Sequence, residues 1–279
     1  MKKTEQYKIL KVLNNNVVLA RNMSNKTEQV LIGTGIGFNT SKGEEVELKK
    51  EKIKKSFMAY DEELEENFLK LLKEFDPELM GICEEIISIA EEKIGELDSH
   101  IHIALTDHIN FAVERLRNGM DINNPFTDEI KFLYEKEYEI GEIASKKLKE
   151  ANKIDIPESE IAFIAMHIHA ARKNKAVSET VRYTSLLKEV IELIEDELGI
   201  KLEKSNINYS RLITHIRFSI NRMQQNKIIS NPLKEKIREE FTESYQIAQK
   251  IGKIVEKKLD LKVNEDELGY ITLHLQRLR

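Results

Sequence analysis

The residues with the most useful chemistry in this chain are two pairs of histidines that recur at a constant spacing. His108 lies in the segment LTDHINFAVERL, and His215 lies 107 residues later in LITHIRFSINRM. His167 lies in EIAFIAMHIHAAR, and His274 lies, again 107 residues later, in ELGYITLHLQRLR. Because two separate histidines share one offset, the chain is predicted to contain a duplicated domain, each copy holding one histidine pair.

Imidazoles at these positions can act in several ways. A neutral imidazole is a good nucleophile near neutral pH and can accept a phosphoryl group, which adds about −1.5 to −2 charge. Arginines that could pair with that negative charge lie close in sequence to the histidines in both copies: Arg115, Arg117, Arg172, Arg217, Arg222 and Arg277. A general base would need an aligned carboxylate, but Asp107, beside His108, is replaced by Thr214 in the second copy. A histidine that only packs inside an apolar helix is the remaining alternative.

A metal site is a further interpretation, based on two His-x-His segments. His100 stands with His102, and His167 stands with His169. Residues i and i+2 of a helix point to different faces, so each pair would need non-helical backbone to converge on one ion. The second copy lacks counterparts of His102 and His169. No metal ligand is therefore predicted.

Length and composition limit the class of protein. A chain of 279 residues permits about two or three domains, and 41% apolar with 33% charged residues is typical of a helix-rich soluble protein. The single cysteine, Cys83, excludes an internal disulfide and is predicted to be inert in a helix. No apolar run approaches the roughly 18 residues of a membrane span, and no signal-peptide pattern is present. A cytoplasmic protein is expected.

The charge is distributed unevenly along the chain. Residues 1–55 carry twelve basic and six acidic side chains, a net charge of +6, whereas the whole chain carries −5. The remainder therefore carries −11. A small basic domain on an acidic body indicates that only the first segment meets a polyanion.

The first segment is predicted to be a small antiparallel β domain. Four short strands are expected at Tyr7–Leu13, Val17–Ala20, Gln29–Gly33 and Glu45–Leu48. Asn14, Asn15 and Asn16 form a predicted turn between the first two. The bend GTGIGF, residues 33–38, lacks the spacing of a dinucleotide loop and no helix pattern follows it, so no cofactor is predicted. The core of such a domain is small, and dimerisation would enlarge it.

Helix patterns dominate after a charged connector at residues 49–61. The predicted helices of the first copy are a stripe from Leu64 to Phe75, then Pro77–Ile94, His100–Asn118, Phe132–Asn152 and one from Pro157 through His167. A polar linker is expected at residues 173–183. The predicted helices of the second copy are Leu186–Leu198, Tyr209–Gln225, Pro232–Leu259 and Glu265–Arg279. The fold class is thus a multidomain α+β protein with two homologous all-α five-helix domains.

Over its whole length the sequence resembles the BglG/SacY-type transcriptional antiterminators of bacteria. The motifs that carry the resemblance are KVLNNNV, IGTGIGF, LTDHINFA, AFIAMHI, LITHIRF and YITLHL. HIHIALTDHI together with MHIH is most similar to the glucose-type branch. The resemblance implies an RNA-binding domain at residues 1–58 and two regulation domains of the sugar phosphotransferase system at 62–174 and 180–279.

The resemblance also implies roles for particular residues. His108 and His167 would accept phosphate from the sugar permease (enzyme II), which inactivates the protein. His215 and His274 would accept it from the phosphocarrier protein HPr, which in many members activates. The residues expected to contact RNA are Lys11, Asn14, Asn15, Asn16, Gly33, Thr34, Gly35 and Phe38. Thr34 departs from the family, where this position is commonly basic.

The expected function is a homodimeric, non-enzymatic antiterminator. It would bind a hairpin in a leader transcript and prevent terminator formation upstream of sugar-uptake genes. One alternative is a DNA-binding activator with the same regulation domains, but residues 1–55 are predicted to form strands rather than a helix-turn-helix. Another is a phosphotransfer enzyme, but no nucleotide loop is present.

Overall fold

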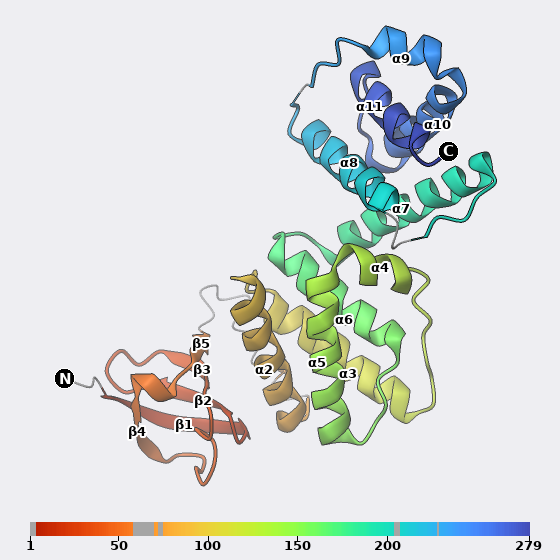
Figure 1. The fold of residues 1–279 in the computed structure, drawn as a ribbon. Coiled ribbons are helices and arrows are strands. Elements are labelled where there is room, and N and C mark those ends of the chain that lie inside the picture. Colours follow the sequence, from red (N-terminus) through yellow and green to blue (C-terminus); the bar gives the residue numbers. More distant parts are fainter. Residues whose placement is uncertain (1–3, 58–69, 72–74, 204–206, 228) are drawn as a thin grey trace. The chain divides into compact units, whose positions relative to one another are not determined.

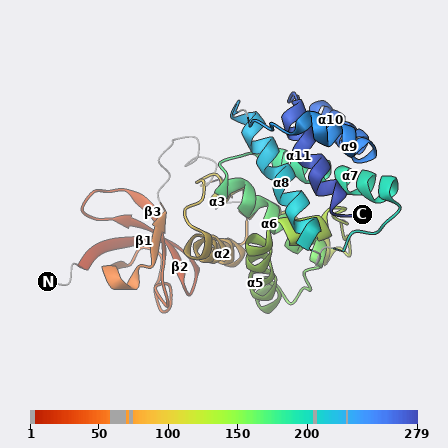
Figure 2. The ribbon, with the colours of Figure 1, turned by 45° about the horizontal axis from the view of Figure 1, so that its top comes forward.

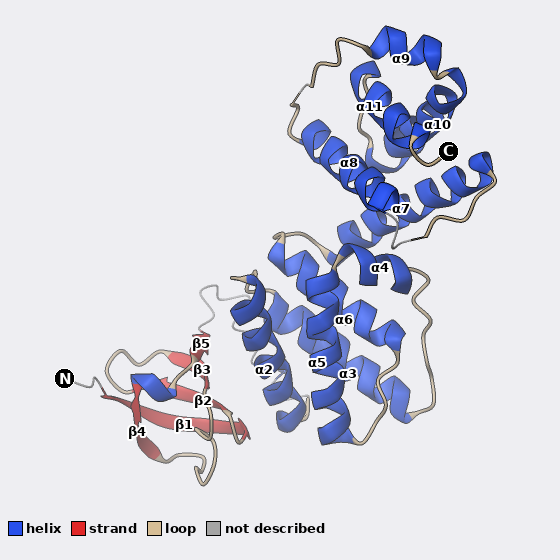
Figure 3. Cartoon of the chain, in the orientation of Figure 1, coloured by secondary structure: helices blue, strands red, loops and turns tan. Residues whose placement is uncertain are grey.

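The computed structural model describes residues 4–57, 70–71, 75–203, 207–227 and 229–279. Its residues form two compact units, Met1–Thr180 and Val181–Arg279. Figure 3 shows that strands are confined to the N-terminal part of the first unit and that helices make up the rest. No described helix is both long and apolar enough to cross a membrane.

The N-terminal strands form one antiparallel sheet in the order β4-β1-β2-β3-β5 (Figure 1). The strands are β1 Thr4–Asn14, β2 Val17–Asn22, β3 Glu28–Ile32, β4 Glu45–Lys49 and β5 Lys55–Phe57. The four predicted strands are confirmed. The fifth corrects the sequence interpretation, because β5 lies in the predicted connector and pairs Val30 with Phe57. The charged sequence of β5 gives no strand pattern, and the strand forms by pairing with the free edge of β3.

Successive residues of a strand point to opposite faces of the sheet, and here both sets are apolar. One face buries Tyr7, Ile9, Val18, Ala20, Leu31, Ile36 and Leu48. The other buries Leu13, Val17, Leu19, Val30 and Ile32. Leu71 and Met80, from the helical part of the same unit, pack against the second face. The small core of the sheet is thereby extended within one chain.

The first set of described helices follows the predicted order. It consists of α2 Pro77–Ile94, α3 Ile101–Arg117, α4 Thr127–Leu133, α5 Glu135–Asn152 and α6 Glu158–Arg172. The α2 limits are confirmed, because Asp76 caps the first turn through Glu78 N and Gly95 ends the helix at φ 92°. Most of the predicted stripe from Leu64 to Phe75 lies outside the described residues.

The second set is α7 Val177–Leu198, α8 Ile207–Gln224, α9 Lys234–Glu240, α10 Thr242–Leu259 and α11 Glu265–Gln276. Figures 1 and 2 show α10 and α11 side by side. The predicted linker at residues 173–183 is wrong in its second half, because α7 begins at Val177. The first turns of α7 are polar, and its apolar stripe begins only later. The sequence pattern therefore did not indicate a helix there.

Two predicted long helices are each interrupted at an equivalent position. The backbone leaves the helical region at Tyr134 and at Phe241, with φ/ψ of −126°/45° and −120°/47°. The predictions Phe132–Asn152 and Pro232–Leu259 therefore each merge parts of two elements. Left-handed residues also recur 107 positions apart, as Lys153 and Asp260. The duplication is thus present in the backbone as well as in the motifs.

Candidate functional site

The first histidine pair is brought together by α3 and α6. The ring centroids of His108 and His167 lie 4.7 Å apart, and Phe163 lies 5.7 Å from the His108 ring. The His108 side chain is 16% exposed. The helices thus place two imidazoles, distant in sequence, in one partly accessible site.

A buried carboxylate lies behind His108. Glu160 Oε2 is 3.3 Å from His108 Nε2, and Glu160 Oε1 accepts a hydrogen bond from Arg115 Nη2 at 2.5 Å. The Glu160 side chain is only 1% exposed. Burial would raise the pKa of Glu160, but the neighbouring His108 and Arg115 lower it below its usual range. Glu160 is therefore a fixed negative charge at the back of the site.

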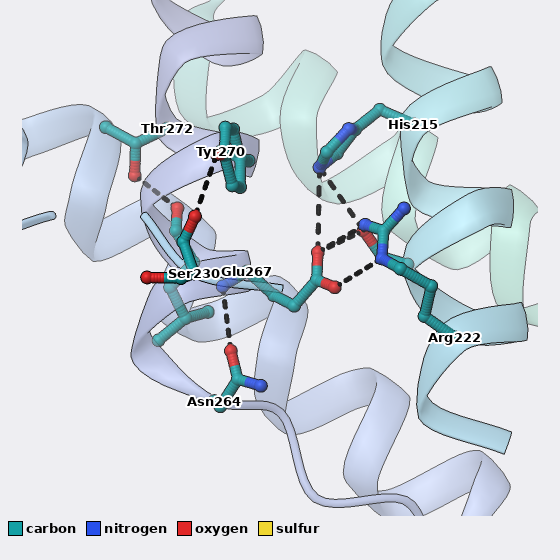
Figure 4. A network of polar contacts seen from close by, with 9 residues as sticks. His215, Arg222, Ser230, Asn264, Glu267, Tyr270 and Thr272 are labelled. Carbon is teal, nitrogen blue, oxygen red and sulfur yellow. Dashed lines mark hydrogen bonds and ion pairs between the residues drawn. The ribbon is translucent and has the colours of Figure 1, made fainter. Parts of the chain in front are cut away.

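The second pair repeats this arrangement between α8 and α11. The His215 and His274 ring centroids lie 4.6 Å apart, and Tyr270 lies 5.8 Å from the His215 ring. Figure 4 shows Arg222 and His215 reaching Glu267 from the neighbouring helix. Arg222 donates to both Glu267 oxygens, at 2.8 and 2.7 Å.

A hydroxyl distinguishes the second site from the first. Ser219 Oγ lies 3.2 Å from His215 Nε2 and 2.6 Å from Glu267 Oε2, and it accepts a bond from Arg222 at 3.0 Å. The direct separation between His215 Nε2 and Glu267 Oε2 is 3.8 Å. The first copy has Ala112 at the position of Ser219. Serine therefore bridges a contact that is direct in the first site.

Three of the four imidazoles are held neutral. Burial, aided by the nearby His108, lowers the pKa of His167 to about 3. Burial, aided by His274, lowers the pKa of His215 to about 4, although the Glu267 charge opposes the shift. Burial also lowers the pKa of His274. A neutral ring keeps a nitrogen lone pair, so these groups are nucleophiles at physiological pH.

Two further histidines of the first copy have their own partners. His102 Nδ1 lies 2.8 Å from Glu84 Oε2 in the core, where both side chains are buried. His169 Nδ1 lies 3.0 Å from Glu137 Oε1 and stacks on Tyr134 at 3.9 Å. Among the described residues, no group of three or more His, Cys, Asp or Glu side chains could hold a metal ion. Each of these two histidines is engaged by a carboxylate.

The asparagine turn and the glycine bend form one continuous surface. Gly35 N donates to Asn16 Oδ1 at 2.9 Å, and Gly33 N donates to Asn16 O at 2.9 Å. Gly37 N donates to Asn15 O at 3.0 Å, and a Cβ at Gly37 would lie 2.1 Å from a backbone oxygen. Only glycine therefore permits this approach.

The other predicted RNA contacts differ in exposure. Phe38 follows the bend with 62% of its surface exposed, which is unusual for so large an apolar side chain. Thr34 lies between Gly33 and Gly35 and is exposed. Lys11 on β1 is half-buried, and burial lowers its pKa. Thr34 and Phe38 are thus exposed beside the bend, and the contact of these residues with RNA stays a prediction.

A side chain of α2 contacts the asparagine turn. Asn14 Nδ2 and Asn16 Nδ2 both donate to Glu85 Oε1, at 3.0 and 3.1 Å. Lys147 Nζ donates to Glu85 Oε2 at 2.6 Å. A Cβ at Gly81 would meet the Asn14 amide nitrogen at 2.5 Å, so glycine allows α2 to approach. The asparagine amides are thereby occupied by a carboxylate of the same unit.

Sequence reasoning missed the carboxylates of both sites. Glu160 and Glu267 open the two repeated motifs and share the offset of 107, which was a usable signal. Ser219 could not be found in that way, since its counterpart differs. Glu85 gave no signal, because nothing in sequence indicates that α2 meets the asparagine turn.

Profiles of two domain families match the chain. The "CAT RNA binding domain" matches residues 7–66. The "PRD domain" matches twice, at residues 84–171 and 188–278. The matched segments contain the asparagine turn and the two histidine pairs respectively.

Curated relatives match nearly the whole chain. The "PtsGHI operon antiterminator" of Bacillus subtilis is 40% identical over 275 residues, covering 98% of this chain and 97% of the relative. The "Transcription antiterminator LicT" of the same species is 33% identical over 275 residues, covering 97% and 98%. The "GlcA/glcB genes antiterminator" of Staphylococcus carnosus is 34% identical over 273 residues, covering 96% and 94%.

Proposed function

Because the chain belongs to the family of transcription antiterminators that join a CAT RNA-binding domain to PRD domains, we propose roles for its sites within that function. The protein is an RNA-binding antiterminator of sugar genes, regulated by phosphorylation through the sugar phosphotransferase system. We assign residues 1–58 to RNA binding and residues 62–174 and 180–279 to regulation. Its role is regulatory rather than enzymatic, and it acts in the cytoplasm, where leader transcripts are made.

The asparagine turn and the glycine bend are the proposed RNA interface. Its members are Lys11, Asn14, Asn15, Asn16, Gly33, Thr34, Gly35 and Phe38. Short polar side chains, main-chain groups and an exposed aromatic ring are the groups that read looped or distorted RNA. The observation that supports the proposal is the set of hydrogen bonds between turn and bend, which holds Asn16 against Gly33 and Gly35. A leader hairpin bound here would be unable to join the terminator.

The two histidine pairs are the proposed phosphorylation sites. His108 and His167 would take phosphate from the sugar permease, which inactivates the protein. His215 and His274 would take it from HPr. Each site has a neutral imidazole, His167 or His215, and a partly exposed histidine close to a buried carboxylate, which supports acceptance of phosphate. The added charge would shift an equilibrium between a homodimer and less associated forms.

The RNA role is tested by titrating the full chain against a leader hairpin from a sugar operon at two salt concentrations. We expect binding that weakens with salt and is absent with duplex DNA. Asn16→Ala should weaken it roughly tenfold, or about 1.4 kcal/mol. Asn25→Ala, in the other exposed turn of the sheet, is the matched control and should bind normally. Equal binding to duplex DNA, or a normal Asn16→Ala variant, would contradict the assignment.

The first regulation site is tested by His108→Asp, which places a negative charge where phosphate would be. Antitermination in a reporter strain should fall. The matched variant His100→Asp changes an exposed histidine outside the pair and should leave the reporter unchanged. An unchanged reporter with His108→Asp would contradict the inhibitory role.

A further inference from the structure

We propose that the phosphoryl group joins Nδ1, not Nε2, of His108 and of His215, because a carboxylate on the neighbouring helix holds the Nε2 proton. Glu160 does so directly, and Glu267 does so through Ser219. The inference rests on the proposed function and specifies its reacting atom. It also gives Glu160, Glu267 and Ser219 a role as positioning residues.

The hydrogen-bond chain of the second site determines where the His215 proton lies. Ser219 has one hydroxyl hydrogen, and its 2.6 Å contact directs that hydrogen to Glu267 Oε2. The hydroxyl oxygen accepts from Arg222. Its remaining lone pair faces His215 Nε2 at 3.2 Å, so that nitrogen must be the donor. The lone pair of the neutral His215 ring therefore lies on Nδ1.

The first site reaches the same state without a hydroxyl. His108 Nε2 and Glu160 Oε2 are buried atoms 3.3 Å apart, and neither has a hydrogen-bond partner among the described residues. A carboxylate can only accept, so the proton belongs on Nε2. Because Nε2 is buried, the exposed part of the His108 ring lies elsewhere. A phosphoryl group could not reach Nε2 without displacing the ring from the carboxylate.

The phosphoryl transfer forms one N–P bond, breaks another and moves no proton. The Nδ1 lone pair of His215 forms the new N–P bond, and the N–P bond of the donor phosphohistidine breaks. The electron pair of that bond returns to the donor imidazole. The His215 ring becomes a cation with its proton still on Nε2, where the chain through Ser219 to Glu267 stabilises it. A buried carboxylate thus acts on the ring that reacts without touching the phosphoryl group.

The reacting atom can be measured directly. The full chain, labelled with 15N-histidine and carrying His108→Ala, His167→Ala and His274→Ala, is phosphorylated with phosphoenolpyruvate, enzyme I and HPr. Coupled 15N and 31P NMR at alkaline pH then identifies the isomer on His215. We expect the Nδ1 isomer to predominate. Predominance of the Nε2 isomer would overturn this inference alone, whereas absence of phosphate on His215 would overturn the proposed function as well.

The positioning role is tested by Glu267→Gln in the same background. A glutamine amide can donate toward Ser219 and allow the hydroxyl to donate to Nε2, which moves the ring proton to Nδ1. We expect phosphorylation to slow at least roughly tenfold, with a larger share of the Nε2 isomer. Glu240→Gln, an exposed glutamate on α9, is the matched control. An unchanged rate and isomer ratio would overturn the role.

The two copies supply a reciprocal exchange that does not depend on the Glu267 variant folding. Ser219→Ala gives the second site the residue of the first, and Ala112→Ser gives the first site the residue of the second. Both variants should keep the Nδ1 isomer, because the carboxylate remains. A change to the Nε2 isomer in Ser219→Ala, together with an unchanged isomer in Glu267→Gln, would show that serine alone sets the atom and would overturn the role of the carboxylate.

Discussion

The two histidine sites share a centre but differ in what surrounds it. Each has two imidazoles at 4.6–4.7 Å and a carboxylate, 1% exposed, that binds an arginine. Around this centre the first copy has His102 paired with Glu84 and His169 paired with Glu137. The histidine pair and its buried carboxylate are thus duplicated, whereas the histidine–carboxylate pairs around them are not.

The surrounding pairs have changed together. The second copy has Tyr209 and Ile191 at the positions of His102 and Glu84. It has Gln276 at the position of His169, bonded at 2.9 Å to Ser244 at the position of Glu137. A buried carboxylate left without its partner is costly, so such a pair is lost or kept as a unit. The comparison teaches which residues must be exchanged jointly.

The largest effect is expected from splitting the buried pair of the first copy. Glu84→Ile alone should destabilise the first helical domain by about 3 kcal/mol, because His102 loses its partner in the core. Glu84→Ile with His102→Tyr, the residues of the second copy, should recover most of the loss. Urea unfolding followed by circular dichroism measures both. If Glu84→Ile alone were as stable as the double variant, the two residues would not need to be exchanged together.

The Glu137 pair should give the first copy a dependence on acid that the second lacks. Burial would raise the pKa of Glu137, but hydrogen bonds from His169 and Arg172 outweigh it and lower the pKa to about 2. A lowered pKa stabilises the fold above the ordinary value of 4.5, and that stability is lost as pH falls toward 2.

Replacing that pair by the second copy's residues should remove the dependence. Glu137→Ser with His169→Gln should flatten the fall in stability between about pH 4.5 and 2, a change of up to roughly 3 kcal/mol. Thermal unfolding across this range measures it. An equally steep fall in the double variant would show that other carboxylates dominate.

A smaller effect is expected at Gly81, where α2 of the first copy contacts the sheet. The second copy has Lys188 at the position of Gly81. Gly81→Ala should push Asn14 away from Glu85 and raise the affinity of the full chain for RNA roughly threefold to tenfold, or about 1 kcal/mol. Glu85→Gln should act in the same direction. Glu92→Gln, exposed on the same helix, is the control, and unchanged affinity in both test variants would refute the effect.

The smallest effect concerns the acidity of the imidazoles themselves. With a pKa of about 4, His215 should remain neutral between pH 7 and 5, as should His167 with a pKa of about 3. Ring resonances in 15N-histidine NMR should therefore hold constant over that range. Titration of His215 near pH 6.5 would mean that the ring is more hydrated than its burial indicates.

The sequence predicted these sites best where the two copies agree. The shared offset identified both histidine pairs, and caps such as Asp76 and Gly95 located the ends of α2. The interruptions at Tyr134 and Phe241 carry no glycine or proline, so periodicity ran through them. Contacts between elements could not be predicted, since Glu84 and Glu137 lie 18 and 32 residues from their histidines.

Glu85 occupies the asparagine turn and would therefore compete with RNA for it. Because that carboxylate is tethered, its effective concentration near Asn14 and Asn16 does not fall when the protein is diluted. At the proposed interface, RNA would bind only the fraction of molecules in which the turn is free, so its apparent Kd would be the intrinsic Kd divided by that fraction. Any event that moves α2 away from the turn then acts as a change in RNA affinity, without altering a single RNA-contacting residue.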